Sequence, residues 1–289
     1  MPAVTEPLFD SAQYKASQKQ DWSNVAAGWK KWWQTMEHCA KPVSDRLVEL
    51  AQIRTGHKVL DVATGIGEPA VTAARKVGPT GRVIATDQAT QMLAVARERA
   101  AELGLTNLEF REIDAEALDF PRERFDAILS RWGLMFLPNL TGALANMHRL
   151  LKPGGRLAAA VWGPSPKAPF ISLAINTVRQ QLHLPPPPPG MLGPFSLADA
   201  TILERALTRA GFSDIRSEPL TLLFEWASAE DYTRFQQDIA APIIAMVAKE
   251  PPARQAMVWR AITEAARQYA GADGTVKMPG EAICWSARR

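Results

Sequence analysis

The feature that most restricts the fold is an apolar run that passes into a glycine-rich turn and then into a helical pattern. It reads Val59-Leu60-Asp61-Val62-Ala63-Thr64-Gly65-Ile66-Gly67-Glu68-Pro69-Ala70. Gly65 and Gly67 permit backbone conformations that other residues adopt only at a cost, and they leave room for a ligand close to the main chain. Pro69 suits the first turn of a helix, where its missing N–H is not needed. The stretch therefore predicts a strand, a tight turn with a ligand against it, and a helix.

Apolar β-rich runs alternate with helical stretches on both sides of this turn. We expect strands at Lys58–Ala63, Arg82–Asp87, Leu108–Ile113, Phe125–Ser130 and Arg156–Trp162. We expect helices to begin near Glu68, Thr90 and Thr141, the third ending within Leu151-Lys152-Pro153-Gly154-Gly155, where a cation precedes helix-stopping residues. This alternation is typical of βαβ units around a parallel sheet.

The pattern changes after Trp162. An apolar stretch at Phe170–Leu182 is stopped by five prolines, Pro185 to Pro189, which favour a stiff extended connector. Beyond it we expect a helix at Leu197–Ala210, a strand within Ile215–Phe224, helices at Ala229–Lys249 and Ala253–Ala270, and a last strand at Ala282–Ala287. Pro242 should bend or split the first helix of the pair. The pair is therefore expected to be an insertion between the last two strands.

The segment before the first strand has a tryptophan-rich helical face. Apolar side chains recur at spacings of three and four, at Trp22, Val25, Trp29, Trp32, Trp33 and Met36. This face either anchors the helix on the core or covers a ligand pocket, and for the second role we name Trp29 and Trp33. His38, which adjoins the same helix, is the one candidate for a catalytic base.

Composition narrows the class of protein. Lys and Arg total 33 against 30 Asp and Glu, so the net charge of +3 provides no strong basic field for nucleic acid. The absence of an apolar run of about 20 residues and of a signal-peptide core leads us to expect no membrane span and a cytoplasmic location. Two cysteines, Cys39 and Cys284, are too few for a disulfide framework, so we expect buried thiols and no metal site.

The glycine spacing alone leaves two ligands open. Gly65-x-Gly67-x-x-Ala70 also fits a dinucleotide-binding turn, which holds a pyrophosphate at the helix N-terminus. Asp61 lies in the strand just before the turn, where a phosphate ligand gains little from a second negative charge. S-adenosylmethionine, which carries a sulfonium and an ammonium group, suits an acid there. Asp61 can equally hold the turn through backbone N–H groups, and both roles remain open.

Two further acids end the next two expected strands. Asp87 follows the second strand at the end where α/β sheets place their ligands, and its carboxylate can accept hydrogen bonds from both hydroxyls of a ribose. Asp114 follows the third strand and can accept a hydrogen bond from an adenine amino group. The ribose contact is common to NAD and S-adenosylmethionine, so these acids predict an adenosine ligand without choosing between the two.

Taken in order, these motifs resemble class I S-adenosylmethionine-dependent methyltransferases of the ubiquinone/menaquinone-biosynthesis group. The matching stretches are Leu60-Asp61-Val62-Ala63-Thr64-Gly65-Ile66-Gly67, Ala85-Thr86-Asp87, Met92-Leu93-Ala94-Val95-Ala96, Asp114-Ala115-Glu116, Phe125-Asp126-Ala127 and Leu151-Lys152-Pro153-Gly154-Gly155. The resemblance implies an α/β fold with a Rossmann-like seven-stranded, mostly parallel sheet, an antiparallel last strand, N-terminal helices and a helical insertion. Ala63 stands where many members have glycine, which is tolerable if the backbone there is extended.

The resemblance also implies the cofactor S-adenosylmethionine, with its methionine end at the glycine turn, its ribose on Asp87 and its adenine beside Asp114 and Ala115. The candidate cofactor-binding residues are Asp61, Ala63, Thr64, Gly65, Gly67, Asp87, Gln88, Met92, Asp114, Ala115 and Arg131. The expected organisation is an N-terminal helical cap over residues 1–50, a cofactor-binding core over 51–163, and substrate-side helices, the proline-rich loop and the last two strands over 164–289.

The substrate side is expected to begin after the fourth strand, at Arg131-Trp132-Gly133-Leu134-Met135-Phe136. Trp132, Met135, Phe136 and Trp162 either pack on an apolar substrate or fill the core beneath the loop. The loop lacks the Asn/Asp-Pro-Pro-aromatic motif of nucleic-acid-base methyltransferases, so we expect a small-molecule acceptor with an O-, C- or N-nucleophile and no nucleic-acid partner. The alternatives are an NAD(P)-dependent oxidoreductase and a non-catalytic S-adenosylmethionine-binding protein.

Overall fold

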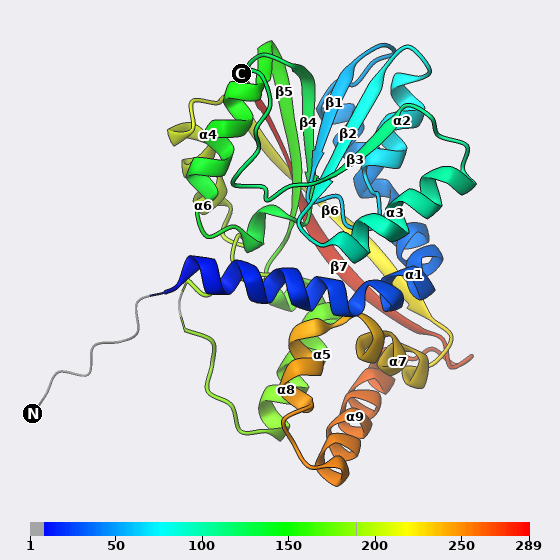
Figure 1. Cartoon of the computed structure of the whole chain (residues 1–289). Coiled ribbons are helices and arrows are strands. Elements are labelled where there is room, and N and C mark those ends of the chain that lie inside the picture. Colours follow the sequence, from blue (N-terminus) through cyan, green and yellow to red (C-terminus); the bar gives the residue numbers. More distant parts are fainter. Residues whose placement is uncertain (1–8, 189) are drawn as a thin grey trace, which may run out of the picture.

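One seven-stranded sheet organises the molecule (Figure 1). The structure, a computed structural model, describes residues 9–188 and 190–289, so the start of the expected N-terminal cap and the fifth proline of the connector lie outside the described residues. The strands are β1 (Lys58–Val62), β2 (Arg82–Asp87), β3 (Leu108–Glu112), β4 (Phe125–Arg131), β5 (Leu151–Trp162), β6 (Ser213–Trp226) and β7 (Val276–Arg288). Their order across the sheet is β3-β2-β1-β4-β5-β7-β6.

The strand directions bring the carboxyl ends of β1 to β5 to a single edge. β1 pairs in parallel with β2 and β4, β2 with β3, and β4 with β5, whereas β7 is antiparallel to both β5 and β6. The central strands are nearly continuous apolar runs because both faces of a parallel sheet are buried. The predicted sheet, with its antiparallel last strand, is confirmed. Ligands of such sheets bind at the carboxyl edge.

Helices cover the sheet and extend beyond its carboxyl edge (Figure 1). They are α1 (Ser11–Leu50), α2 (Ala70–Val77), α3 (Thr90–Glu102), α4 (Leu140–Leu150), α5 (Pro169–Gln181), α6 (Ala200–Arg209), α7 (Ala229–Ile239), α8 (Ala241–Val247) and α9 (Pro252–Ala266). Cys39 and Cys284 are free, buried thiols, as expected. Among the described residues, no helix is both long enough and apolar enough to cross a bilayer.

The helical insertion lies between β6 and β7, as predicted, but it contains α7, α8 and α9 rather than two helices. The first predicted helix is split at Ala240, and Pro242 lies in the first turn of α8. A proline is harmless there because the first N–H groups of a helix have no intrahelical acceptor. In the interior of one long helix the same proline would not be tolerated. The break before Pro242 is thus one of the two outcomes expected of this residue, a bend or a split.

The helix predicted to end within Leu151-Lys152-Pro153-Gly154-Gly155 ends directly before this segment, but the segment itself belongs to a strand and not to a helix stop. Helix α4 ends at Leu150, and Leu151 already pairs with Phe125 as the first residue of β5. The pairing then shifts register between Phe125 and Ala127, and Gly154 adopts a φ of 78°. Proline and glycine here mark an irregularity within a strand, which uses the same residue types as a helix stop.

A single 40-residue helix, α1, replaces the several N-terminal helices that were expected. The Asp10 side chain caps its start by accepting hydrogen bonds from the backbone N–H groups of Ala12 and Gln13 at 2.9 and 3.0 Å. Helix α1 contacts α3 on one side and α7 and α8 on the other. Figure 1 shows it crossing the carboxyl edge of the sheet, with α5, α7, α8 and α9 beyond it.

The contact between α1 and α7 depends on Gly28. A Cβ atom at Gly28 would lie 1.9 Å from the carbonyl oxygen of Asp238. The Asp238 carboxylate accepts hydrogen bonds from Lys31 Nζ and Trp32 Nε1, both at 2.7 Å. The two helices can approach this closely only because residue 28 has no side chain.

We expect Gly28→Ala to lower the free energy of unfolding by about 1–3 kcal/mol, the usual cost of forcing extra volume into a packed contact. Alanine favours a helix over glycine by about 1 kcal/mol, so a loss of stability would identify the clash as the larger effect. Urea unfolding measures the change. Asn24→Ala, at an exposed position of the same helix, is the control and should be neutral or stabilising; equal effects of the two substitutions would contradict the clash.

Candidate functional site

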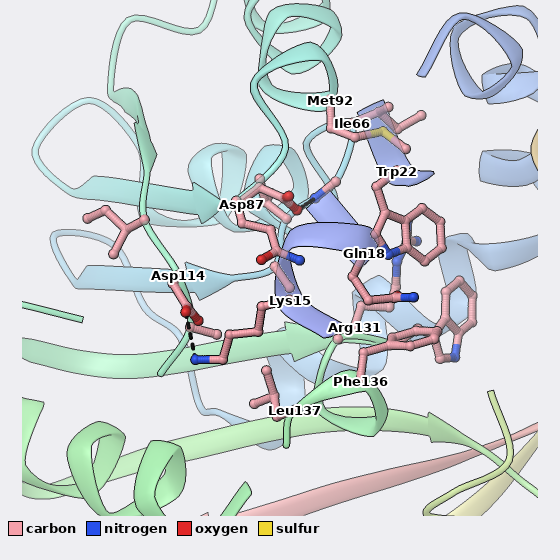
Figure 2. Close-up of a pocket in the computed structure, with 18 of the residues that line it drawn as sticks. Lys15, Gln18, Trp22, Ile66, Asp87, Met92, Asp114, Arg131, Phe136 and Leu137 are labelled. Carbon is pink, nitrogen blue, oxygen red and sulfur yellow. Dashed lines mark hydrogen bonds and ion pairs between the residues drawn. The ribbon is translucent and has the colours of Figure 1, made fainter. Parts of the chain in front are cut away.

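A cavity lies at the carboxyl edge of the sheet, beneath α1 (Figure 2). Its lining comes from α1, from the start of α3, and from the ends of the strands β1 to β4 with the segments that follow them. The lining residues are Tyr14, Lys15, Gln18, Trp22, Trp29, Ala63, Thr64, Gly65, Ile66, Glu68, Asp87, Gln88, Met92, Ile113, Asp114, Ala115, Arg131, Trp132, Gly133, Phe136, Leu137 and Pro138. Most of the predicted cofactor residues are thereby brought together in one cavity.

The turn after β1 has a left-handed backbone. Gly65 has a φ of 56°, and Ala63, which was expected to be extended, has a φ of 58°. A residue with a Cβ is disfavoured in this conformation. Space for the Ala63 methyl comes from Gly133, where an added Cβ would lie only 2.5 Å from Ala63 Cβ. The departure from glycine at position 63 is thus accommodated by a glycine after β4.

Asp61 and Gly67 lie behind the turn and do not line the cavity. Asp61 is fully buried, and its Oδ2 accepts a hydrogen bond from the backbone N–H of Ala70 at 3.1 Å. At Gly67 an added Cβ would lie 3.4 Å from Ala96 Cβ on α3, so this glycine allows close helix packing. The sequence left two roles open for Asp61, binding the ligand and holding the turn. The structure shows the hydrogen bond that the second role requires.

Burial raises the pKa of Asp61 to about 7. The unfolded carboxyl group ionises near its ordinary value of about 3.9, so between these two pH values the folded protein binds the extra proton. The contribution of Asp61 to folding stability is therefore present at low pH and is lost as the pH rises toward 7.

We expect wild type to lose stability relative to Asp61→Asn between about pH 5 and pH 7, by at most about 1.4 kcal/mol per pH unit, with no further change above that range. Asparagine can still accept the Ala70 N–H bond but cannot ionise, so the difference isolates the proton on Asp61. Urea unfolding at a series of pH values measures it. Parallel stability profiles for the two proteins would show that Asp61 does not titrate there.

Asp87 lines the cavity at the end of β2 (Figure 2). Its Oδ2 accepts a hydrogen bond from Gly65 N–H at 2.8 Å, and its Oδ1 accepts one from Ala89 N–H at 2.9 Å. Burial raises the pKa of this carboxyl group. Each carboxylate oxygen can accept a second hydrogen bond, so Asp87 can hold the glycine turn and still bind ligand hydroxyls.

Asp114 faces a lysine that the sequence argument did not identify. Lys15 on α1 places its Nζ 2.8 Å from Asp114 Oδ2 (Figure 2). The same Nζ lies 2.5 Å from Glu116 Oε2. Asp114 Oδ1 accepts a hydrogen bond from the backbone N–H of Glu116 at 2.9 Å. The third acid is therefore in the cavity, and α1 closes over it through an ion pair.

Comparison with known proteins agrees with this arrangement. Residues 59–155 match a family model described as a methyltransferase domain. Among curated relatives, the ubiquinone/menaquinone biosynthesis C-methyltransferase UbiE of Pseudomonas putida is 43% identical over 111 residues, and that of Pseudomonas syringae pv. syringae is 44% identical over the same length. Each alignment covers 38% of this chain and 43% of the relative, so the chain matches less than half the length of these relatives.

Residues 59–155 are thus similar in sequence to methyltransferase domains, including those of S-adenosylmethionine-dependent type. The resemblance seen in the sequence is confirmed for this part of the chain. The fold extends further: the [4+2]-cyclase SpnF matches with a TM-score of 0.55, 24% identity and coverage of 86% of this chain and 81% of that one. The YcgJ protein of Bacillus subtilis matches with a TM-score of 0.56, 19% identity and coverage of 86% and 98%. At these identities the solved structures show the fold alone.

A buried ionic cluster joins the methyltransferase domain to α1. Arg131 donates hydrogen bonds to Glu37 Oε1 at 3.0 Å and to Ser44 Oγ at 2.8 Å. Glu68, which lines the cavity, has its Oε1 3.9 Å from Arg99 Nη2. Burial raises the pKa of Glu68, and the nearby Glu37 carboxylate adds to the increase. Arg131 was predicted from the sequence, whereas Glu68, which follows the glycine turn directly, was not.

Three predicted substrate-pocket residues, Trp29, Trp132 and Phe136, line the cavity, whereas Trp33, Met135 and Trp162 do not. Trp33 follows Trp29 by four residues, which moves it about 6 Å along the helix axis, and its ring packs against the Arg99 guanidinium at 4.7 Å. Met135 and Trp162 are 2% and 5% exposed and belong to the core beneath the loop.

His38 does not line the cavity either. It follows Trp29 by nine residues, about 2.5 helical turns, and so lies on the opposite side of α1. Tyr14 and Gln18, by contrast, were missed although they line the cavity. The signal for them was present, because the spacing of four from Tyr14 to Gln18 to Trp22 continues the helical face toward the N-terminus.

Proposed function

We propose that this protein transfers a methyl group from S-adenosylmethionine to a small-molecule acceptor. The observation that carries the proposal is the single cavity in which the glycine turn, Asp87 and Asp114 face an aromatic wall formed by α1 and the segment after β4. A cofactor held by the first group would present its methyl group toward the second. A cavity roofed by α1 suits a small acceptor better than a nucleic-acid strand.

The cofactor would lie along the carboxyl ends of β1, β2 and β3. Its methionine end would rest on Thr64 and Gly65, its ribose hydroxyls would donate hydrogen bonds to Asp87, and its adenine would lie beside Asp114 and Ala115. The buried carboxylates of Glu68 and Asp87 suit the positive charge of the sulfonium and ammonium groups, because opposite charges interact strongly where water is excluded. S-adenosylmethionine supplies the electrophilic methyl carbon.

The residues of the chain would act mainly by positioning. In an in-line displacement the sulfonium leaves as a neutral thioether, so no acid is needed to assist its departure. Holding the acceptor about 3–3.5 Å from the methyl carbon can account for much of the rate enhancement. No histidine is present in the described lining of the cavity. An acceptor that loses its proton readily or after transfer would need no base from the protein, whereas an alcohol would need one.

Two other functions are compatible with the same features, those of an NAD(P)-dependent oxidoreductase and of a non-catalytic S-adenosylmethionine-binding protein. An NAD(P)-dependent oxidoreductase would also have a glycine turn and an acid at Asp87. The structural match to a [4+2]-cyclase shows that a non-methyltransferase reaction is compatible with this fold. Fold alone does not determine function, so the cofactor and the transferred group must be measured directly.

Calorimetry with S-adenosylhomocysteine and with NADH tests the proposal, followed by transfer of labelled methyl from S-adenosylmethionine to compound classes and extract components. We expect S-adenosylhomocysteine to bind and NADH not to bind. Asp87→Ala should weaken S-adenosylhomocysteine binding by about 10-fold, because it removes charge-assisted bonds to hydroxyl groups.

Asp126→Ala is the matched control for Asp87→Ala. The Asp126 carboxylate also accepts a backbone hydrogen bond, from Lys58 N–H at 2.8 Å, but Asp126 does not line the cavity. Equal losses in the two variants would remove Asp87 from the site. Binding of NADH in place of S-adenosylhomocysteine would favour the oxidoreductase, and cofactor binding without transfer to any component would favour a non-catalytic protein.

A further inference from the structure

Trp132 has an unusual backbone conformation at the floor of the cavity. It follows β4 directly and adopts a φ of 60°, a left-handed conformation that is a genuine outlier for a bulky residue. Its backbone N–H donates a hydrogen bond to the Ala160 carbonyl at 2.8 Å, which helps to hold this conformation. Strained residues persist where the surrounding structure fixes them, and they cluster at functional sites.

Two neighbouring side chains pack on the indole ring of Trp132. Trp162 stacks on it with 4.1 Å between ring centroids and 13° between planes, and the Arg131 guanidinium lies over the ring at 4.9 Å. Arg131 is itself held by Glu37 and Ser44 on α1. These contacts hold the ring in one orientation.

The Trp132 N–H group has no hydrogen-bond acceptor within the described residues, although it is buried. The Trp29 indole, on the α1 wall of the same cavity, is in the same condition. Leaving a buried donor unpaired costs free energy, and native structures pair the great majority of such groups. The indoles of Trp226 and Trp285 are also buried and unpaired, but neither lines the cavity.

We propose that Trp132 is a substrate-positioning residue whose indole N–H donates a hydrogen bond to an oxygen atom of the methyl acceptor. The inference rests on the proposed function and specifies its substrate class: an apolar molecule that carries a hydrogen-bond-accepting oxygen. The walls formed by Trp22, Phe136 and Leu137 suit the apolar body of such a molecule. A donor fixed in advance loses little conformational freedom on binding and discriminates against analogues that lack the oxygen.

Indole N–H resonances in protein labelled with 15N-tryptophan report the bond directly. The probes are 2-naphthol and naphthalene, which share an apolar body and differ in the oxygen, each added to protein saturated with S-adenosylhomocysteine. The signal of Trp132 is assigned by its loss in Trp132→Phe. We expect 2-naphthol to shift the Trp132 proton downfield, naphthalene not to do so, and Trp226 and Trp285 to keep their positions.

Trp132→Phe and Trp162→Phe are a matched pair, since each shortens one member of the same stack and only the first removes the N–H of a residue that lines the cavity. We expect Trp132→Phe to weaken 2-naphthol binding by about 10-fold and Trp162→Phe by no more than about twofold, with S-adenosylhomocysteine affinity unchanged in both. Equal losses, or no downfield shift with 2-naphthol, would overturn the inference.

Two further results of the same experiments would have other meanings. A downfield shift of the Trp132 proton with S-adenosylhomocysteine alone would assign the indole to the cofactor and overturn its role toward the acceptor. Failure of the wild-type protein to bind S-adenosylhomocysteine would contradict the proposed function instead, because cofactor affinity is measured in the same samples before any probe is added.

Discussion

Gly65→Val is expected to lower the affinity for S-adenosylhomocysteine by at least about 100-fold, which corresponds to about 2.8 kcal/mol. Gly65 lines the cavity, and no atom lies within 4 Å of the position that its Cβ would occupy. A valine side chain would therefore project into space that the cofactor needs, where backbone must approach the ligand. Its N–H group also bonds to Asp87, so the turn and the expected ribose ligand are disturbed together.

Gly104→Val separates this effect from backbone strain. Gly104 has a φ of 65°, against 56° at Gly65, and its Cβ position is equally free of neighbours, but it lies in the turn after α3, outside the cavity lining. Valine at either position should destabilise the fold by roughly 1–2 kcal/mol through its left-handed backbone. Calorimetry should find normal binding only in Gly104→Val. Retained binding in Gly65→Val would mean that the cofactor lies elsewhere.

The cofactor side of the site was predictable from the sequence because its residues follow from local rules. A parallel sheet places the carboxyl ends of its strands at one edge, so Asp87 and Asp114 had to lie near the glycine turn once the strands were identified. The ends of the strands could also be predicted from the sequence, since buried parallel strands are short apolar runs. The structure adds that Asp87 holds the turn through Gly65, a contact across 22 positions that no local pattern indicates.

The errors arose where one sequence signal fits two structures. The Leu151–Gly155 segment contains residues that stop helices and also residues that form irregular strands, and only its pairing with β4 decides between them. The left-handed conformation of Ala63 could not be predicted locally, because Gly133, the glycine that leaves room for its methyl group, is 70 positions away. Trp33 shares a helical periodicity with Trp29, but where the cavity ends along α1 depends on tertiary packing.

Helix α1 is held at several places along its length, which suits a roof better than a loose appendage. Near its N-terminus, Lys15 binds Asp114 and Glu116, and Lys19 binds Glu112 at 2.6 Å. Further along, Trp32 donates a hydrogen bond to Asp238 of α7. The first contacts are partly exposed ion pairs that are weak individually. The second lies at the Gly28 contact, where the helices cannot slide without a clash.

The four tryptophans of α1 therefore divide into two groups. Trp22 and Trp29 line the cavity, whereas Trp32 bonds to Asp238 and Trp33 packs on Arg99. The two roles considered for this face, anchor and roof, are both present, on different residues. A substitution at Trp29 and one at Trp33 can distinguish them, because the side chains are identical and lie one turn apart.

We expect Trp29→Ala to leave S-adenosylhomocysteine affinity within about threefold of wild type while lowering the rate of methyl transfer by about 10- to 100-fold, since a slightly misplaced acceptor costs that much. The Trp29 ring packs against Trp22 with 6.2 Å between centroids, and Trp22 meets Phe136 of the opposite wall at 5.6 Å. Removing Trp29 would open this aromatic wall to water. The rate is measured with the acceptor found in the labelled-methyl screen, below the melting temperature of the variant.

Trp33→Ala should behave in the opposite way. It removes the contact with Arg99 and part of the packing between α1 and α3, so we expect a lower melting temperature and a normal transfer rate for the folded protein. A roof residue affects closure and positioning, whereas an anchor residue affects the folded population. If Trp29→Ala also only melts earlier and transfers at the normal rate, α1 is a scaffold at this point, and the acceptor must be held by Trp132 and Phe136 instead.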